Sequence, residues 1–171
     1  MAGQANAPAY SPGRGWQKLM SAVVEISELK SLVGPRQRLL GMDPGSKTIG
    51  LALSDLTLTI ATPLEIIART KFKNDAARLK EIIEKEDVGG FVIGWPVNMN
   101  GTEGPRCQST RAFSDNLAKA FDLPQVFWDE RLSTAAVERA LIEADSSRNK
   151  RKQVIDKMAA AYILQGALHA L

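Results

Sequence analysis

The order of apolar and polar positions predicts that the domain begins with a β-hairpin over residues 38–55. An apolar run at 39–42 ends in Asp43, and the turn-forming residues Pro44-Gly45-Ser46 follow it. In the next stretch the large apolar residues Ile49, Leu51 and Leu53 alternate with the small residues Gly50, Ala52 and Ser54, which is a period of two. We therefore expect a buried strand, a tight turn whose N–H groups are open to a phosphate, and a second strand whose small face admits a closely packed helix.

Shorter patterns extend this hairpin into a mixed sheet. Residues 58–67 predict a third strand, placed at an edge or bulged by Pro63, and 91–93 and 126–128 predict short buried strands. Helical spacing predicts helices at about 16–32, from Asn74 to Gly89-Gly90, at about 106–121, from Ser133 or Thr134 to Ala144, and after Lys152. Three strands followed by alternating helices and strands predict an α/β fold with an antiparallel meander, parallel additions and helices on the faces of the sheet.

The composition of the chain excludes several kinds of functional site. The chain has 171 residues and a net charge of +3, which is compatible with nucleic-acid binding but does not require it. The single cysteine, Cys107, excludes an intrachain disulfide and a cysteine-based zinc cluster, and the single histidine, His169, argues against histidine-centred sites. The sequence shows neither a membrane span nor a secretory signal, so we expect a cytoplasmic protein.

Carboxylates at the ends of predicted elements are candidates for a metal site. Asp43 follows the first strand, Glu130 (with Asp129 beside it) follows the last strand, and Asp156 is expected one turn into the final helix. Adjacent residues of an extended strand point in opposite directions, so we favour Glu130 over Asp129. Each acid alone has an ordinary explanation, as a turn residue, a solvated strand end or a partner of the helix dipole. Together they match the hard oxygen ligands that Mg²⁺ prefers.

Basic residues cluster around the last of these acids. Arg148, Lys150, Arg151 and Lys152 precede Asp156 closely, and Arg106 and Arg131 lie beside other predicted site segments. A charge run is usually a solvated face, but here it adjoins a candidate metal ligand. We therefore expect these groups to neutralise phosphates of a nucleic acid.

Four motifs in this order resemble the YqgF/RuvX family. They are Asp43 to Asp55, Gly94 to Arg106, Asp129 to Thr134, and Ile155 to Ala160, and the resemblance covers residues from Arg36 to the end. Trp95 departs from the family, which more often has Leu there. The segment before Arg36 is an additional N-terminal segment, and the family suggests no role for it. We expect residues 1–35 to form a flexible tail with a short helix, and residues 36–171 to form the domain.

The resemblance implies an RNase H-like fold and a cytoplasmic nuclease that matures the 5′ end of pre-16S rRNA, a family earlier described as Holliday-junction resolvases. It implies that Asp43, Glu130 and Asp156 bind Mg²⁺ or Mn²⁺, with one metal or two left open. The residues expected to contact nucleic acid are Lys47, Asn98, Asn100, Arg106, Arg131, Arg148, Lys150, Arg151 and Lys152.

Three alternatives remain open at this point. The substrate is precursor rRNA or a four-way DNA junction, and the chain is a monomer or a homodimer, of which a resolvase requires the dimer. A non-catalytic protein that binds nucleic acid or a ribosome-assembly partner is the second alternative. The third notes that Asp43 to Thr48 also resembles the phosphate loop of actin-like sugar kinases, which need two such lobes and hence a longer chain.

Overall fold

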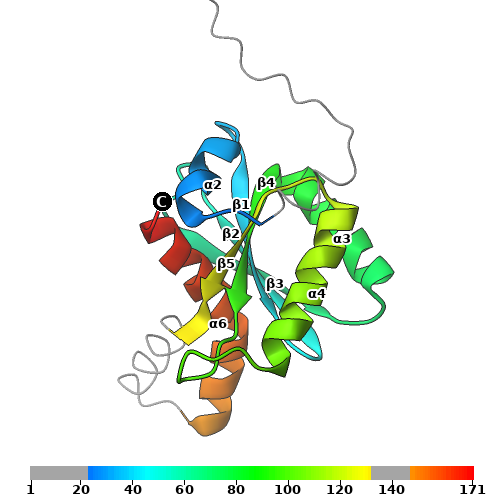
Figure 1. Cartoon of the computed structure of the whole chain (residues 1–171), viewed down its shortest axis with the longest axis vertical. Coiled ribbons are helices and arrows are strands. Elements are labelled where there is room, and N and C mark those ends of the chain that lie inside the picture. The colour runs from blue at the N-terminus through cyan, green and yellow to red at the C-terminus, as the bar shows by residue number, and fades with distance from the viewer. Residues whose placement is uncertain (1–22, 132–146) are drawn as a thin grey trace, which may run out of the picture.

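A computed structural model describes residues 23–131 and 147–171 of the chain (Figure 1). A five-stranded mixed sheet with the order β3-β2-β1-β4-β5 lies at its centre. Helices α3 and α4 cover one face of the sheet, and α2 and α6 cover the other (Figure 1). The expected RNase H-like arrangement, with three antiparallel strands and two parallel additions, is confirmed.

The hairpin comes first in the sheet. Strand β1 (Arg38–Pro44) pairs antiparallel with β2 (Thr48–Ser54), which pairs antiparallel with β3 (Ala61–Ala68). Strand β4 (Val88–Trp95) is parallel to β1, and β5 (Gln125–Asp129) is parallel to β4. As predicted, β3 is an edge strand, and the pairing register shifts where Pro63 lies opposite Ala52.

The helices are α2 (Ile26–Leu32), α3 (Phe72–Glu86), α4 (Pro105–Ala120) and α6 (Arg148–His169). The alternation in β2 sorts its residues as expected: Ile49, Leu51 and Leu53 join the core beneath α3 and α4, and Ala52 joins the core beneath α6. A Cβ on Gly41 would lie 2.7 Å from Leu164 Cβ and 3.0 Å from the Ala160 carbonyl oxygen. The helix α6 therefore packs directly on the bare backbone of β1.

Both predicted boundaries of the helix α3 are wrong. Helix α3 begins after Lys71, its N-cap, so Asn74 lies inside the first turn and does not cap it. It ends at Asp87, which adopts a left-handed conformation with φ of 52° and stops the helical hydrogen bonds. Gly89 and Gly90 then lie inside β4, which is longer than the predicted 91–93 because Val88 and Gly90 already pair with Arg38 and Leu39 of β1.

The final helix begins earlier than the sequence suggested. Ser147 caps α6 and accepts a hydrogen bond from the Lys150 amide at 3.4 Å. The basic residues from Arg148 therefore belong to the helix, and Asp156 lies more than two turns into it, not one. The helix predicted from Ser133 or Thr134 to Ala144 falls outside the described residues.

The first described residues also differ from the predicted helix over 16–32. Val23 pairs with Gln125 of β5, and the helix starts only at Ile26; residues 16–22 lie outside the described part. Leu29 of α2 is fully buried among residues of the α6 core. Across the described ranges, none of the helices has the length and apolar character needed to span a bilayer.

Candidate active site

Asp43 lies at the carboxyl end of β1, the central strand of the sheet. Side chains alternate along β1: Leu40 and Met42 enter the core beneath α3 and α4, whereas Leu39 enters the core beneath α6. Asp43 therefore falls on the α6 side of the sheet, where it is partly buried. Its neighbours in the pairing are Gly50 on β2 and, by continuation of the β1–β4 register past Met42 and Ile93, Gly94 on β4.

Glu130 reaches the same place from β5, on the far side of β4. It directly follows Asp129, the last residue of β5, and its side chain lies against Gly94. A Cβ at Gly94 would be 2.7 Å from Glu130 Oε1 and 3.1 Å from Glu130 Cγ, so any side chain there would displace the carboxylate. The missing side chain on β4 leaves the space through which Glu130 meets Asp43.

The two carboxyl groups interact, and the pKa of Glu130 shows it. Burial of Glu130 is the main cause that raises its pKa to about 7, and the charge of Asp43 together with a hydrogen bond to Asp43 raises it further. Glu130 Oε1 is also buried without a hydrogen-bond donor among the described residues. Two ionised carboxylates cannot donate to each other, so the pair requires either a shared proton or a cation.

Arg106 supplies one positive charge to this pair. Its Nη2 lies 3.9 Å from Glu130 Oε2, and its side chain is 67% exposed while that of Glu130 is 16% exposed. The guanidinium lowers the pKa of Glu130, but burial and Asp43 outweigh it. Arg106 lies in the first turn of α4, so the helix brings a phosphate-binding group to the edge of the site.

Asp129 is the last residue of β5, and its carboxylate pairs with the neighbouring Arg131. It accepts hydrogen bonds from the Arg131 side chain, including one of 2.6 Å from Nη2 to Oδ2. This bond is the main cause that lowers the pKa of Asp129. Glu130 interacts with Asp43, and the choice of Glu130 over Asp129 as a ligand stays a prediction.

The turn after Asp43 is held by a residue that the sequence analysis missed. The Arg69 guanidinium donates from Nη1 to the Gly45 carbonyl at 2.6 Å, and the Arg69 amide donates to the Lys47 carbonyl at 2.9 Å. Within the turn, the Gly45 amide donates to the Thr48 carbonyl at 2.8 Å. Lys47 itself is exposed at the tip, as a contact to nucleic acid requires. Arg69 is 24 residues from Gly45 in sequence, so no local pattern pointed to it.

The predicted contacts in the 96–104 loop are exposed, and their side chains also order the loop. The Asn98 amide group donates to Thr102 Oγ1 at 3.0 Å, and Asn100 Oδ1 accepts from the Thr102 amide and hydroxyl at 3.1 and 2.6 Å. Gly101 adopts φ of 84°, which allows the tight turn between them. Both asparagines therefore sit on a defined surface near the site.

The remaining predicted residues lie on α6. The structure describes the backbone of α6 but not the side chains of Asp156, Arg148, Arg151 and Lys152, while Lys150 is exposed. Within the described side chains, three or more acidic, histidine or cysteine residues do not gather into a metal-binding group. The structure thus brings together Asp43, Glu130 and Arg106, and the meeting with Asp156 remains a prediction.

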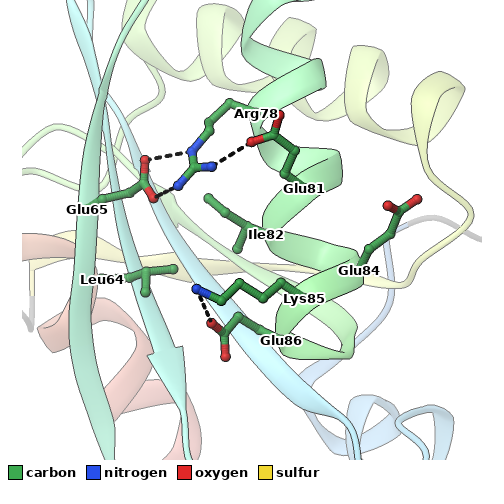
Figure 2. Close-up of a pocket in the computed structure, with 8 residues that line it drawn as sticks. All are labelled: Leu64, Glu65, Arg78, Glu81, Ile82, Glu84, Lys85 and Glu86. Atoms are coloured by element: carbon green, nitrogen blue, oxygen red, sulfur yellow. Dashed lines mark hydrogen bonds and ion pairs between the residues drawn. The ribbon is translucent and has the colours of Figure 1, made fainter.

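A hollow on the other side of the molecule does not compete with this site. It has a volume of about 580 Å³ and lies between β3 and α3, at the edge of the sheet (Figure 2). Arg78 spans it, with hydrogen bonds of 2.6 Å to both Glu65 and Glu81 (Figure 2). The other two carboxylates of its lining are also in ion pairs, Glu84 with Lys80 at 3.8 Å and Glu86 with Arg38 at 3.7 Å.

Comparison with known proteins shows the family of the chain. Residues 37–170 match the family described as "RuvX: Holliday junction resolvase". A protein of Methylocella silvestris named "Putative pre-16S rRNA nuclease" is 58% identical over 153 residues, which cover 90% of this chain and 95% of the relative. A protein of the same name from Paramagnetospirillum magneticum is 61% identical over 146 residues, covering 85% and 94%.

Among solved structures, the RuvC protein of T. thermophilus in complex with a Holliday junction substrate has a TM-score of 0.49 and 18% identity, covering 78% of this chain and 94% of that one. The family match and the close relatives extend over most of the sequence, including every residue of the site. The chain therefore belongs to the RuvX family of nucleases, hydrolases that act on phosphodiester bonds.

Proposed function

We propose that this nuclease is metal-dependent and processes the 5′ end of pre-16S rRNA in the cytoplasm. The observation that carries the metal dependence is the partly buried pair of Asp43 and Glu130. Its two carboxylates face each other, and one oxygen of Glu130 has no donor in the described part of the chain. A bound Mg²⁺ or Mn²⁺ would satisfy that oxygen and offset the repulsion that raises the pKa of Glu130.

Position 156 of α6 supports a third ligand. The Ala160 carbonyl and Leu164 pack on Gly41, two residues before Asp43. Residue 156 precedes Ala160 by four positions, so it shares that face of the helix one turn nearer the N-terminus of α6. The orange start of α6 lies at the end of the sheet where β4 and β5 finish (Figure 1). We therefore assign Asp43, Glu130 and Asp156 as the metal ligands and catalytic acids.

A divalent cation bound there would activate water and stabilise the charge that develops on the phosphate. The protein groups hold the acids and the substrate in place. Gly94 admits the Glu130 side chain, and Arg69 fixes the turn beyond Asp43. Lys47, Arg106, Arg131, the two loop asparagines and the basic start of α6 would contact the nucleic-acid backbone and position it without reading its sequence.

The test of the metal site compares Asp43→Asn with Asp122→Asn. Asp122 is exposed in the loop before β5, so its variant removes one carboxylate at a distance from the site. We expect Asp43→Asn to abolish Mg²⁺-dependent cleavage and weaken Mn²⁺ binding in calorimetry, while nucleic-acid binding in EDTA stays close to the parent value. Asp122→Asn should behave as the parent. If Asp43→Asn cleaves as fast as the parent, or if the parent binds neither cation at millimolar concentration, the metal-dependent function is wrong.

A second candidate substrate follows from the description of the matched family. That description is a Holliday junction resolvase, so a four-way DNA junction is the alternative to precursor rRNA. A resolvase must cut two strands in a paired way, which calls for a symmetric dimer. Cleavage of both substrates by the same preparation, together with sedimentation of the free protein, separates a monomeric or dimeric rRNA nuclease from a dimeric junction resolvase.

A further inference from the structure

An arginine beside the site is held by aromatic rings. The Arg111 guanidinium lies over the Trp95 ring at 5.1 Å and over the Phe127 ring at 5.9 Å, measured from its central carbon to the ring centroids. Trp95 and Phe127 themselves pack with centroids 4.5 Å apart and planes tilted by 36°. The three side chains come from α4, β4 and β5, so the sheet and a helix jointly fix the stack.

The electrostatic surroundings of Arg111 differ from those of the neighbouring arginines. Arg106 pairs with Glu130, and Arg131 pairs with Asp129. Among the side chains that the structure describes, Arg111 forms no ion pair with a carboxylate, and it is exposed. Its charge is therefore available to a ligand, and cation–π contacts with the two rings hold its position.

The stack lies on the α4 face of the sheet, opposite the face that carries Asp43 and Glu130, and the two faces meet at the carboxyl edge of the sheet. Trp95 directly follows Gly94, the residue against which Glu130 packs, and it pairs with Asp129 in the β4–β5 register. Along α4, Arg111 follows Arg106 by five residues, a rise of about 7.5 Å along the helix axis. A nucleic-acid strand with a phosphate near Glu130 would thus reach Arg111 within a few nucleotides, over the carboxyl edge of the sheet.

We propose that Arg111, supported by Trp95 and Phe127, is a stacking platform for an unpaired nucleobase next to the bond that is cut. This inference rests on the proposed function for the nucleic-acid ligand and for the position of the bond that is cut. Bases that are free of a duplex stack on arginine planes and aromatic rings, and this stacking tolerates any base sequence. A lysine at this position would keep the charge but could not offer a planar group. The platform therefore recognises a single-stranded segment flanking the cleavage site.

The test uses the full chain in EDTA, so binding is measured without cleavage. The probe is a single-stranded RNA oligonucleotide with one 2-aminopurine, scanned along the strand, whose fluorescence falls when the base stacks. The variants are Arg111→Ala, Arg111→Lys and Trp95→Leu. The control is Arg36→Ala, which removes one exposed arginine from the turn before β1, at the opposite end of the sheet.

We expect one probe position to be quenched by the parent and by Arg36→Ala, and to lose this quenching in all three platform variants. Arg111→Ala should also weaken binding by roughly 5- to 150-fold, the range found when one base loses its stacking partner. If Arg111→Lys keeps both affinity and quenching, Arg111 contacts a phosphate and the platform is wrong. If Arg111→Ala binds as tightly as Arg36→Ala, Arg111 does not touch the strand and the proposal is overturned.

Circular dichroism and thermal unfolding show whether each variant is folded. We expect the Arg111 variants to fold because Arg111 is exposed. The result does not depend on catalysis. A chain that stacks the probe base in EDTA but never cleaves with Mg²⁺ would refute the proposed function and leave the platform standing. If the Arg111→Lys variant cleaves and binds as the parent does, the platform is refuted and the proposed function stands.

Discussion

Glu130 lies against the bare α-carbon of Gly94, and this contact lets its carboxylate cross β4 to meet Asp43. The acids come from β1 and from the end of β5, with β4 between them. A side chain on β4 at this level would separate them. The sheet thus forms the carboxylate pair by omitting a side chain as much as by supplying two.

The first prediction is that Gly94→Ala strongly impairs catalysis. Its Cβ would lie 2.7 Å from Glu130 Oε1, so the carboxylate must move away from Asp43. A displacement of about 1 Å at a catalytic group can lower the rate roughly 100-fold, which is the loss we expect in single-turnover cleavage.

The same Cβ would meet Ile163 Cδ1 at 2.6 Å, so a packing effect must be separated from an effect on the acid. Ile163→Val removes that carbon and is the matched control. We expect Ile163→Val alone to stay active, and Gly94→Ala with Ile163→Val to stay impaired. Recovery of full activity in the double variant would mean that Gly94 serves the packing of α6 and not the position of Glu130.

The second prediction concerns the stability of the metal-free protein as a function of pH. The pKa of Glu130 is raised from 4.5 to about 7 by burial first and by Asp43 second, so between these values the folded state binds more protons than the unfolded state. Stability must then fall as the pH rises through this interval, and the penalty is complete above pH 7. The shift corresponds to about 3 kcal/mol at most.

Denaturant unfolding in EDTA at pH 5 and pH 8 measures this effect. The parent should lose more stability between the two values than Glu130→Gln, which cannot ionise. Adding Mg²⁺ at pH 8 should restore stability to the parent and less to the variant, because a cation favours the ionised carboxylate. Identical pH profiles for the two proteins would show that Glu130 is not the titrating group.

The sequence predicts those features of the site that depend on neighbouring residues better than those that depend on residues distant in the chain. The hairpin and the alternation in β2 follow from a period of two within one strand, and the structure agrees with them. The choice of Glu130 over Asp129 as a ligand stays a prediction. The start of α3 was misplaced because Asn74 is a strong capping residue, whereas the chain begins the helix three residues earlier, after Lys71.

Other features depend on residues that are distant in sequence, and no local pattern reports them. Gly94 matters because the registers of β1, β4 and β5 place it between two acids. Arg69 matters because the end of β3 lies beside the first turn, and Arg111 matters because α4 passes over Trp95. Such residues become visible only when the pairing of the strands is known.

The third prediction separates steering of the substrate from catalysis at Arg106. Its side chain is 67% exposed and lies at the edge of the acid pair. Removing it in Arg106→Ala should weaken nucleic-acid binding in EDTA and lower the slope of log affinity against log salt by about 1. Lys119→Ala, exposed in the last turn of the same helix, is the control and should leave the slope unchanged. An unaltered slope in Arg106→Ala would remove Arg106 from the phosphate contacts.

The fourth prediction is that α2 contributes to the stability of the domain, although the sequence assigned residues 1–35 to a tail and the family match begins at residue 37. Leu29 is fully buried in the core shared with α6, whereas Leu32 on the same helix is 52% exposed. Leu29→Ala should lower the free energy of unfolding by about 2–5 kcal/mol, the usual cost of a cavity in a core. Leu32→Ala should change it by less than about 0.5 kcal/mol, as substitutions at exposed positions do.

Urea unfolding of the full chain measures both values and also shows how far α2 is coupled to the site. The Val24 amide donates to the Gln125 carbonyl at 2.8 Å, so the segment before α2 is anchored to the start of β5, the strand whose end carries Glu130. If α2 unfolds together with the sheet, Leu29→Ala should shift a single transition. A separate early transition, or a loss no larger than that of Leu32→Ala, would place the boundary of the folding unit after α2, as the sequence alone suggested.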